Sequence, residues 1–224
     1  MADSTPYATR SDAGRQLAGL LSGYRGERDV VVLALSNGGM PVAFEVARSL
    51  NVPLDVMLLG DLLMPGLGDL DLGAIASTSV EVLDSGRVLR SGIDQDEVRE
   101  AVEERRAELM RHEEDLRNGR PRYERAGKTV ILVDEGLASG SHARAAVKAL
   151  RREAVARLVF AVPIAVPKEI PAIRDEVDEL VCPRTDAAFA VGPWYDQAEE
   201  VGDSEVRDLL ERAAEREPLP GQAG

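Results

Sequence analysis

The segment Thr129–Ser141 restricts the fold more than any other, because a buried strand there leads directly into two acids and a helix. Thr129–Val133 is a continuous β-branched and apolar run, which is typical of a strand buried on both faces. Asp134 and Glu135 follow, and a turn rich in Gly and Ser opens the next helix. This order predicts a parallel sheet with helices on both faces.

Strands and helices alternate along the rest of the chain. Further strands are predicted at Asp29–Leu35, Leu54–Leu59, Arg157–Val162 and Glu179–Cys182. Helices are predicted at Pro41–Leu50, after Gly140, and from a cap at Asp203 or Ser204 onward. Gly60–Asp71 is read as a loop, followed by a short strand pair at Gly73–Ser77 and Val80–Leu83. The fold class is therefore α/β, with a doubly wound, mainly parallel sheet that binds ligands at the carboxyl ends of its strands.

A long charged helix is predicted at Asp94–Leu116, ended by Asn118 and Gly119. Its narrow apolar stripe is formed by Val102, Leu109 and Leu116. This spacing suits a helix on a surface or against a partner, so a homodimer is one expectation. His112 of this helix is read as a solvated side chain without a function.

Composition excludes several classes of protein. A net charge of −13 argues against nucleic-acid binding, which needs clustered cations. No apolar run is long enough for a membrane span, and residues 1–5 do not resemble a signal peptide. Cys182, the single cysteine, excludes an internal disulfide. We expect a cytoplasmic protein with one domain over residues 1–217 and a disordered tail over 218–224.

The acids and the turn after the Thr129–Val133 strand suit a phosphorylated sugar. Backbone N–H groups at a helix N-terminus attract phosphate, and the hydroxyls of Ser139 and Ser141 add donors. Asp134 and Glu135 would repel phosphate, but they can accept hydrogen bonds from vicinal sugar hydroxyls. Read in isolation, the two acids are also compatible with an ordinary turn.

The segment Val130–Ser141 resembles the phosphoribosyl pyrophosphate (PRPP) motif of type I phosphoribosyltransferases. The resemblance extends to residues 12–18, 34–50, 54–76 and 189–195. Together these segments resemble a bacterial group of predicted phosphoribosyltransferases. It implies the type I fold with a small C-terminal hood at about 184–202. It also implies a Mg²⁺-dependent transfer at the anomeric carbon of a ribose 5-phosphate donor, with a role in nucleotide metabolism.

The resemblance assigns roles to particular residues. Asp134 and Glu135 would bind the ribose hydroxyls as the catalytic acids. The 5-phosphate would be bound by Ala138, Ser139, Gly140, Ser141 and His142, and the pyrophosphate by Ser36, Asn37, Gly38 and Gly39. Phe189, Trp194 and Tyr195 would form the hood over the acceptor, although the last two also suit core packing. The metal ligands are not assigned.

Three cations of the family pattern are missing from this chain. The group carries cations where this chain has Asn37, Gly60 and Asp61. Asp61 is read as a surface acid, a magnesium ligand or a replacement acid/base, and His142 as a surface residue or a phosphate-binding cation. Either the chain is an altered phosphoribosyltransferase-like enzyme, or it is a silent relative that binds a nucleotide or sugar phosphate. A third alternative is that another cation, Arg87, Arg90 or Arg122, enters the site.

Overall fold

The computed structural model describes residues 5–64, 70–77, 81–83, 85–138, 140–187 and 192–216. Ser139, Phe189 and the predicted tail 218–224 lie outside these ranges. A sheet of five parallel strands forms the centre, in the order β2-β1-β6-β7-β9. Its strands are β1 (Val30–Leu35), β2 (Leu54–Met57), β6 (Thr129–Val133), β7 (Arg157–Ala161) and β9 (Glu179–Val181). Each predicted strand of the parallel sheet is confirmed, within one or two residues at its ends.

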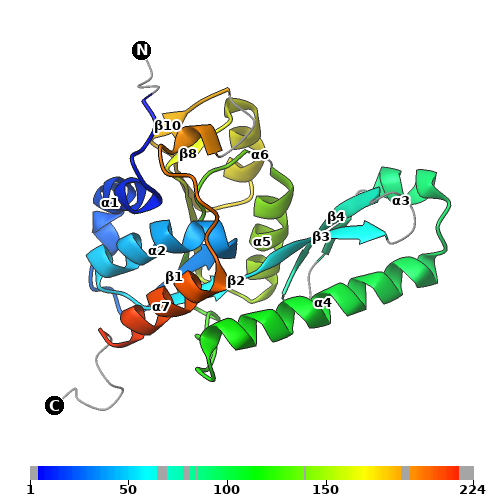
Figure 1. Ribbon diagram of the computed structural model, residues 1–224, viewed down its shortest axis with the longest axis horizontal. Coiled ribbons are helices and arrows are strands. Elements are labelled where there is room, and N and C mark those ends of the chain that lie inside the picture. Colours follow the sequence, from blue (N-terminus) through cyan, green and yellow to red (C-terminus); the bar gives the residue numbers. More distant parts are fainter. Residues whose placement is uncertain are drawn as a thin grey trace.

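Helices cover both faces of this sheet, so the doubly wound prediction is confirmed (Figure 1). One face of the sheet packs against α1 (Arg10–Leu20), α2 (Ser36–Leu50) and α7 (Asp203–Ala214). The other packs against α5 (Gly140–Arg152) and α6 (Ile170–Arg174). Successive strand residues alternate between the two cores, with Val32 in the first and Val31 in the second.

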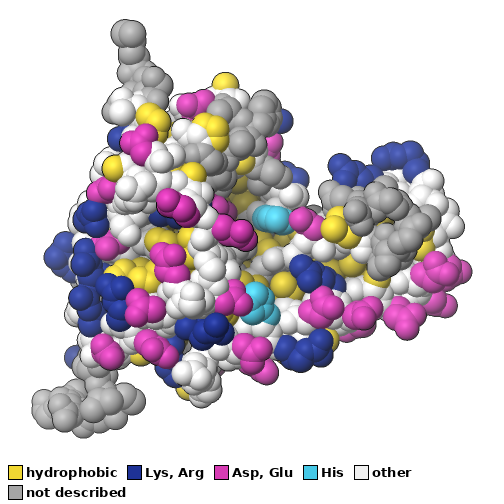
Figure 2. All heavy atoms as spheres, viewed as in Figure 1, with side chains coloured by type: hydrophobic (Ala, Val, Ile, Leu, Met, Phe, Trp, Pro, Cys, Tyr) yellow, Lys and Arg dark blue, Asp and Glu magenta, His cyan; other side chains and the backbone are white. Residues whose placement is uncertain are grey.

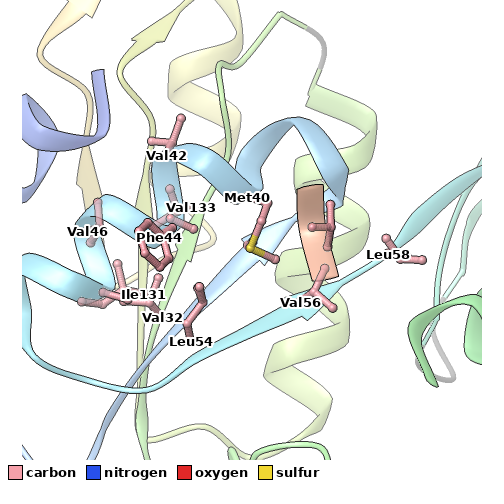
Figure 3. Close-up of a cluster of buried hydrophobic side chains, with 14 of the residues drawn as sticks. Val32, Met40, Val42, Phe44, Val46, Leu54, Val56, Leu58, Ile131 and Val133 are labelled. Atoms are coloured by element: carbon pink, nitrogen blue, oxygen red, sulfur yellow. The ribbon is translucent and has the colours of Figure 1, made fainter. Parts of the chain in front are cut away.

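The core beneath α2 is made of branched and aromatic side chains from three strands and one helix (Figure 3). Val42, Phe44 and Val46 of α2 lie over Val32 of β1 and Ile131 of β6. All five are at most 3% exposed, so this packing fixes the start of α2 relative to the ends of β1 and β6.

An arm projects from the body (Figure 1). It comprises the antiparallel sheet of β3 (Leu59–Met64), β4 (Leu70–Ala76) and β5 (Glu81–Leu83), with α3 (Ser85–Ser91) and the first half of α4 (Gln95–Arg117). The predicted short pair is confirmed in β4 and β5. The loop predicted at Gly60–Asp71 is wrong, because most of it forms β3 and the start of β4. Leu62 and Leu72 are buried there, so burial outweighs the glycines in this segment.

The predicted long helix is confirmed as α4. Asp94 caps its first turn, and Asn118 ends it in the left-handed conformation with φ of 50°. Its apolar stripe, Val102, Leu109 and Leu116, is buried in the chain's own core. The stripe therefore gives no support to the predicted homodimer.

Buried ion pairs fix the C-terminal half of α4 against the body. Arg117 donates to Asp55 of β2 at 2.8 Å and to Glu113 at 2.9 Å. Glu113 also accepts the Leu58 N–H at 2.7 Å, at the junction of β2 and β3. Removing one partner of such a buried pair typically costs about 3–5 kcal/mol. This network therefore sets the position of the α4 residues that face the body.

The segment expected to form the hood contacts the N-terminus of the described chain. It contains β10 (Arg184–Thr185), which pairs with β8 (Ile164–Ala165), and the short helix η3 (Gly192–Trp194). Tyr7 bridges to Tyr195, and both pack with Trp194 in a small apolar cluster. Two further short helices are η1 (Ser22–Tyr24) and η2 (Pro167–Glu169). Within the described ranges, no helix is both long and apolar enough to cross a membrane.

Close contact between α1 and α2 generates a stability prediction. A Cβ added at Gly14 would lie 2.6 Å from the Val42 carbonyl oxygen, whereas one at Gly19 meets nothing within 4 Å. Gly14→Ala should lower the free energy of unfolding by about 1–3 kcal/mol through overpacking. Gly19→Ala on the same helix should raise it by up to about 1 kcal/mol. Urea unfolding of both variants checks this, and equal effects would contradict the packing described.

Candidate functional site

The carboxyl ends of β1, β2 and β6 meet at one edge of the sheet, where the arm joins the body. A cavity of about 500 Å³ opens at this edge. Figure 2 shows that the surface is hollowed at this junction and that both histidine side chains lie on this face. The cavity is lined by Arg10, Ser36, Asn37, Gly38, Leu58, Leu59, Arg105, Glu108, Leu109, His112, Glu135, Glu200 and Val201.

Residues 36–39 form the first turn of α2, which begins five residues before the helix predicted at Pro41–Leu50. Ser36 has a φ of 58°, in the left-handed region that few non-glycine residues adopt. This conformation lets the helix begin directly after β1. Among the described residues, no side chain caps this helix end. Its first N–H groups, with the positive end of the helix dipole, lie at the cavity wall.

Two carboxylates lie against this first turn. A Cβ at Gly38 would overlap Glu135 Oε1, and one at Gly39 would be 2.9 Å from the Val133 carbonyl oxygen and 3.4 Å from Asp134 Oδ1. A larger side chain at Gly38 would displace the Glu135 carboxylate, and one at Gly39 would collide with the backbone at the end of β6. The turn therefore needs glycine for close approach, of the Glu135 carboxylate at Gly38 and of the end of β6 at Gly39.

Glu135 is held by groups from both ends of the chain. Arg10 Nε donates to Glu135 Oε2 at 2.5 Å, and Arg10 also donates to the Glu199 carbonyl oxygen at 2.9 Å. The Tyr195 hydroxyl donates to the backbone carbonyl of Glu135, and the Arg10 guanidinium lies 5.2 Å from the Tyr195 ring centroid. These contacts orient the acid before any ligand binds.

Asp134 has a perturbed acidity. Burial, together with the charge of Glu135, raises the pKa of Asp134 to about 8, although the Glu135 N–H donates to its Oδ1 at 2.8 Å. With this pKa, Asp134 holds its proton at neutral pH. An acid of this kind is suited to proton exchange or to hydrogen bonding with a hydroxyl.

The predicted phosphate cradle at the start of α5 is partly occupied by the protein itself. The Gly140 N–H donates to Glu169 Oε2 at 3.0 Å, so a carboxylate lies where a phosphate oxygen was expected. Ala138 is half-buried beside the hood cluster, and Ser141 lies in the first turn of α5. His142 Nε2 lies 2.6 Å from Asp61 Oδ1, so these two predicted residues contact each other outside the residues that line the cavity.

The cations that line the cavity are Arg10 of α1 and Arg105 of α4. The Arg105 guanidinium lies over Gly60, where an added Cβ would be 2.7 Å from its Nε. Its Nε is buried and has no hydrogen-bond partner within the described ranges. Of the three cations proposed from the sequence, Arg122 pairs with Glu153 and lines a different cavity. Arg87 and Arg90 belong to α3 on the arm and are not among the lining residues.

Asn37 connects the cavity to α7 and α4. Its Nδ2 donates to Asp203 Oδ1 at 2.9 Å, and Asp203 Oδ2 lies 2.7 Å from His112 Nε2. The predicted cap of α7 is wrong, because Gly202 occupies the cap position and the Asp203 side chain is used in these contacts. His112 is solvated as predicted, with its side chain 41% exposed, but its Nε2 also contacts Asp203.

Trp194 and Tyr195 are buried in the hood cluster and are 2% and 4% exposed. The Trp194 ring packs on Gly136, where a Cβ would lie 2.5 Å from a ring carbon. Neither residue lines the cavity. In this structure their contacts support the turn after β6, which favours the core-packing alternative.

Arg10, Arg105 and Glu169 were not identified from the sequence. A signal was available for Arg105. It lies three positions after Val102 of the buried stripe, just as His112 lies three positions after Leu109. That spacing puts both at the edge of the buried helix face. Arg10 and Glu169 contact groups 125 and 29 residues away in the chain, respectively, and no local pattern indicates such pairs.

The fold and the site define an α/β domain that gathers acids and helix N-termini at the carboxyl edge of a parallel sheet. The family model of the phosphoribosyl transferase domain matches residues 75–198. The crystal structure of TT1426 from Thermus thermophilus is 33% identical, with a TM-score of 0.76, and the match covers 93% of this chain and 99% of that one. The chain therefore belongs to the phosphoribosyl transferase domain family, a family of transferases with the type I fold.

Two Mycobacterium tuberculosis proteins are also similar. Rv0571c of strain ATCC 25618 / H37Rv and MT0597 of strain CDC 1551 / Oshkosh are each named provisionally as a phosphoribosyl transferase. Each is 40% identical over 209 residues, which is 92% of this chain and 47% of the relative. The chain thus spans about half the length of these relatives.

The acidity of Asp134 predicts a pH-dependent stability. Because its pKa is raised from 3.8 to about 8, folded protein keeps a proton that the unfolded chain releases, so stability falls as pH rises across that interval. Asp134→Asn should match wild type near pH 4 and should melt at a higher temperature by pH 8. Thermal melts across this range check the prediction, with the exposed Asp175→Asn as control. A difference independent of pH would contradict it.

Proposed function

We propose that this chain catalyses a phosphoribosyltransferase-like transfer at the anomeric carbon of a ribose 5-phosphate donor, either PRPP or a nucleotide-like compound. The observation that carries the proposal is the pair Asp134 and Glu135, held against the first turn of α2 beside a cavity with two arginines. The acceptor is a small molecule that these residues do not identify.

In this proposal, the acids bind the sugar and the helix ends bind its phosphates. Asp134 and Glu135 form hydrogen bonds with the ribose hydroxyls, and the carboxylate of Glu135 stabilises an oxocarbenium-like transition state. Arg10 keeps Glu135 oriented, which lowers the cost of ordering it on binding. The first turn of α2, together with Arg105, faces the leaving group.

A magnesium ion fits this site only together with the donor. In the described part of the chain, no group of three or more His, Cys, Asp or Glu side chains is placed to hold a metal. Asp134 and Glu135 supply the oxygen ligands that Mg²⁺ prefers, and Mg²⁺ is commonly bound by one or two carboxylates plus substrate phosphates. When bound, the ion would neutralise charge on the leaving group.

The alternative is a silent family member that binds a nucleotide or sugar phosphate in a regulatory role. One observation favours this alternative. The Gly140 N–H, where a 5-phosphate is expected to bind, already donates a hydrogen bond to Glu169. Under the transferase proposal, Glu169 must move or be neutralised when the donor binds. The two functions therefore differ in turnover and in how each phosphate contributes to binding.

Calorimetry with PRPP and Mg²⁺, combined with a pyrophosphate-release assay, tests the transferase. Wild type should bind PRPP more tightly than ribose 5-phosphate and should release pyrophosphate when a suitable acceptor is present. Arg105→Gln should weaken PRPP binding about tenfold or more, because a charge-assisted contact is lost, and should affect ribose 5-phosphate less. Arg99→Gln, an exposed residue of the same helix, is the control. Binding of the monophosphate alone, without turnover, would favour the silent protein.

Glu169→Gln tests whether this carboxylate competes with the 5-phosphate. Removing the negative charge at Gly140 should tighten ribose 5-phosphate binding by about tenfold, since like charges no longer repel. Calorimetry measures the change, and the exposed Glu100→Gln controls for net charge. Weaker binding by Glu169→Gln would mean that the carboxylate organises the cradle and does not block it.

A further inference from the structure

Three side chains from three helices form a connected row at the cavity. Asn37 of α2 donates to one oxygen of Asp203 at 2.9 Å, and His112 of α4 lies 2.7 Å from the other. Asn37 and His112 both line the cavity, whereas Asp203 stands behind them on α7. Asn37 also donates to the Val201 carbonyl oxygen at 3.3 Å, which fixes its amide. Asp203 is therefore held on both of its oxygens.

This arrangement determines which nitrogen of His112 can exchange a proton. The hydrogen bonds from Asn37 and His112 lower the pKa of Asp203, so it is a carboxylate at neutral pH and can only accept. His112 Nε2 must then carry a hydrogen. The other ring nitrogen, Nδ1, has no hydrogen-bond partner within the described ranges. A proton added to Nδ1 makes the ring a cation, and Asp203 lies opposite to balance its charge.

The net charge of the cavity lining depends on whether His112 carries this proton. Two arginines and three glutamates line it, and Arg10 pairs with Glu135 while Arg105 pairs with Glu108. Glu200 is then the excess negative charge. An anionic ligand is opposed by this excess unless a further positive charge is present. Histidine is the side chain that can supply one near neutral pH.

We propose that His112 is a substrate-binding residue whose protonated ring donates from Nδ1 to a phosphate oxygen of the donor's diphosphate, with Asp203 and Asn37 as positioning residues. This inference rests on the proposed function and assigns part of its diphosphate recognition. Its consequence is that diphosphate binding takes up a proton at His112 and weakens as the pH rises.

The other charged groups around His112 are the same in wild type and in a His112 variant, including Asp134, whose pKa of about 8 makes it titrate within the pH range tested. On α7 they are Asp203 and Arg207, and Glu200 lies in the segment before that helix. On α4 itself they are Arg105 and Glu108, and the remaining pair is Arg10 of α1 with Glu135 of the turn after β6. A change in binding that depends on His112 can therefore be separated from them by substituting the ring alone.

The test is the pKa of His112 measured by NMR with and without inorganic pyrophosphate. The chain has two histidines, so His142→Gln assigns the two C2–H signals. Saturating pyrophosphate, with EDTA present and ionic strength matched by chloride, should raise the pKa of His112 by about one unit, equivalent to about tenfold tighter binding by the protonated form. Binding that leaves this pKa unchanged would overturn the inference but not the proposed function.

Calorimetry at pH 5.5 and pH 8 gives an independent readout. The wild-type affinity for pyrophosphate, relative to that of His112→Gln, should be about tenfold higher at pH 5.5 and equal at pH 8. The ionisation of pyrophosphate itself is the same in both proteins and cancels. His112→Arg should keep the tighter binding at both pH values. If pyrophosphate binds none of the three proteins, the diphosphate site of the proposed function fails as well.

Discussion

The site depends on close contact between the first turn of α2 and the chain at the end of β6. This contact is possible because Gly38, against the Glu135 carboxylate, and Gly39, against the Val133 carbonyl, carry no side chains. Asp134 and Glu135 end the central strand β6, while the turn begins directly after its neighbour β1. The parallel register of these strands fixes the distance between the two segments. Arg10 then holds Glu135, and the Tyr195 hydroxyl holds its carbonyl, so both ends of the described chain are tied to this contact.

The positive charges of the cavity come from elements outside the strand turns. Asn37 and Gly60 carry no charge, but Arg105 covers Gly60, and Asn37 helps hold Asp203 against His112. Both Arg105 and His112 belong to α4, which the buried ion pairs of Arg117 fix to the body. A helix that also forms part of the arm thus completes the wall of the cavity.

Much of the fold, and less of the site, could be predicted from the sequence. The strand Thr129–Val133 was predicted with its observed bounds, because a strand buried on both faces is a continuous apolar run. β3 was missed because its glycine resembles a loop signal, while its burial depends on contact with α4. Asp134 and Glu135 were found through local pattern. Arg10 and Glu169 act through contacts between distant segments, which local spacing does not encode.

The central claim is that the acids after β6 bind the sugar of a ribose 5-phosphate compound whose phosphate occupies the N-terminus of α5. A crystal structure of the protein soaked with ribose 5-phosphate tests this most directly. The account predicts ribose hydroxyls on Asp134 and Glu135, phosphate on the Gly140 N–H, and Glu169 displaced from the position it holds here. A phosphate bound elsewhere, with Glu169 still on Gly140 and both acids free of the sugar, would contradict it.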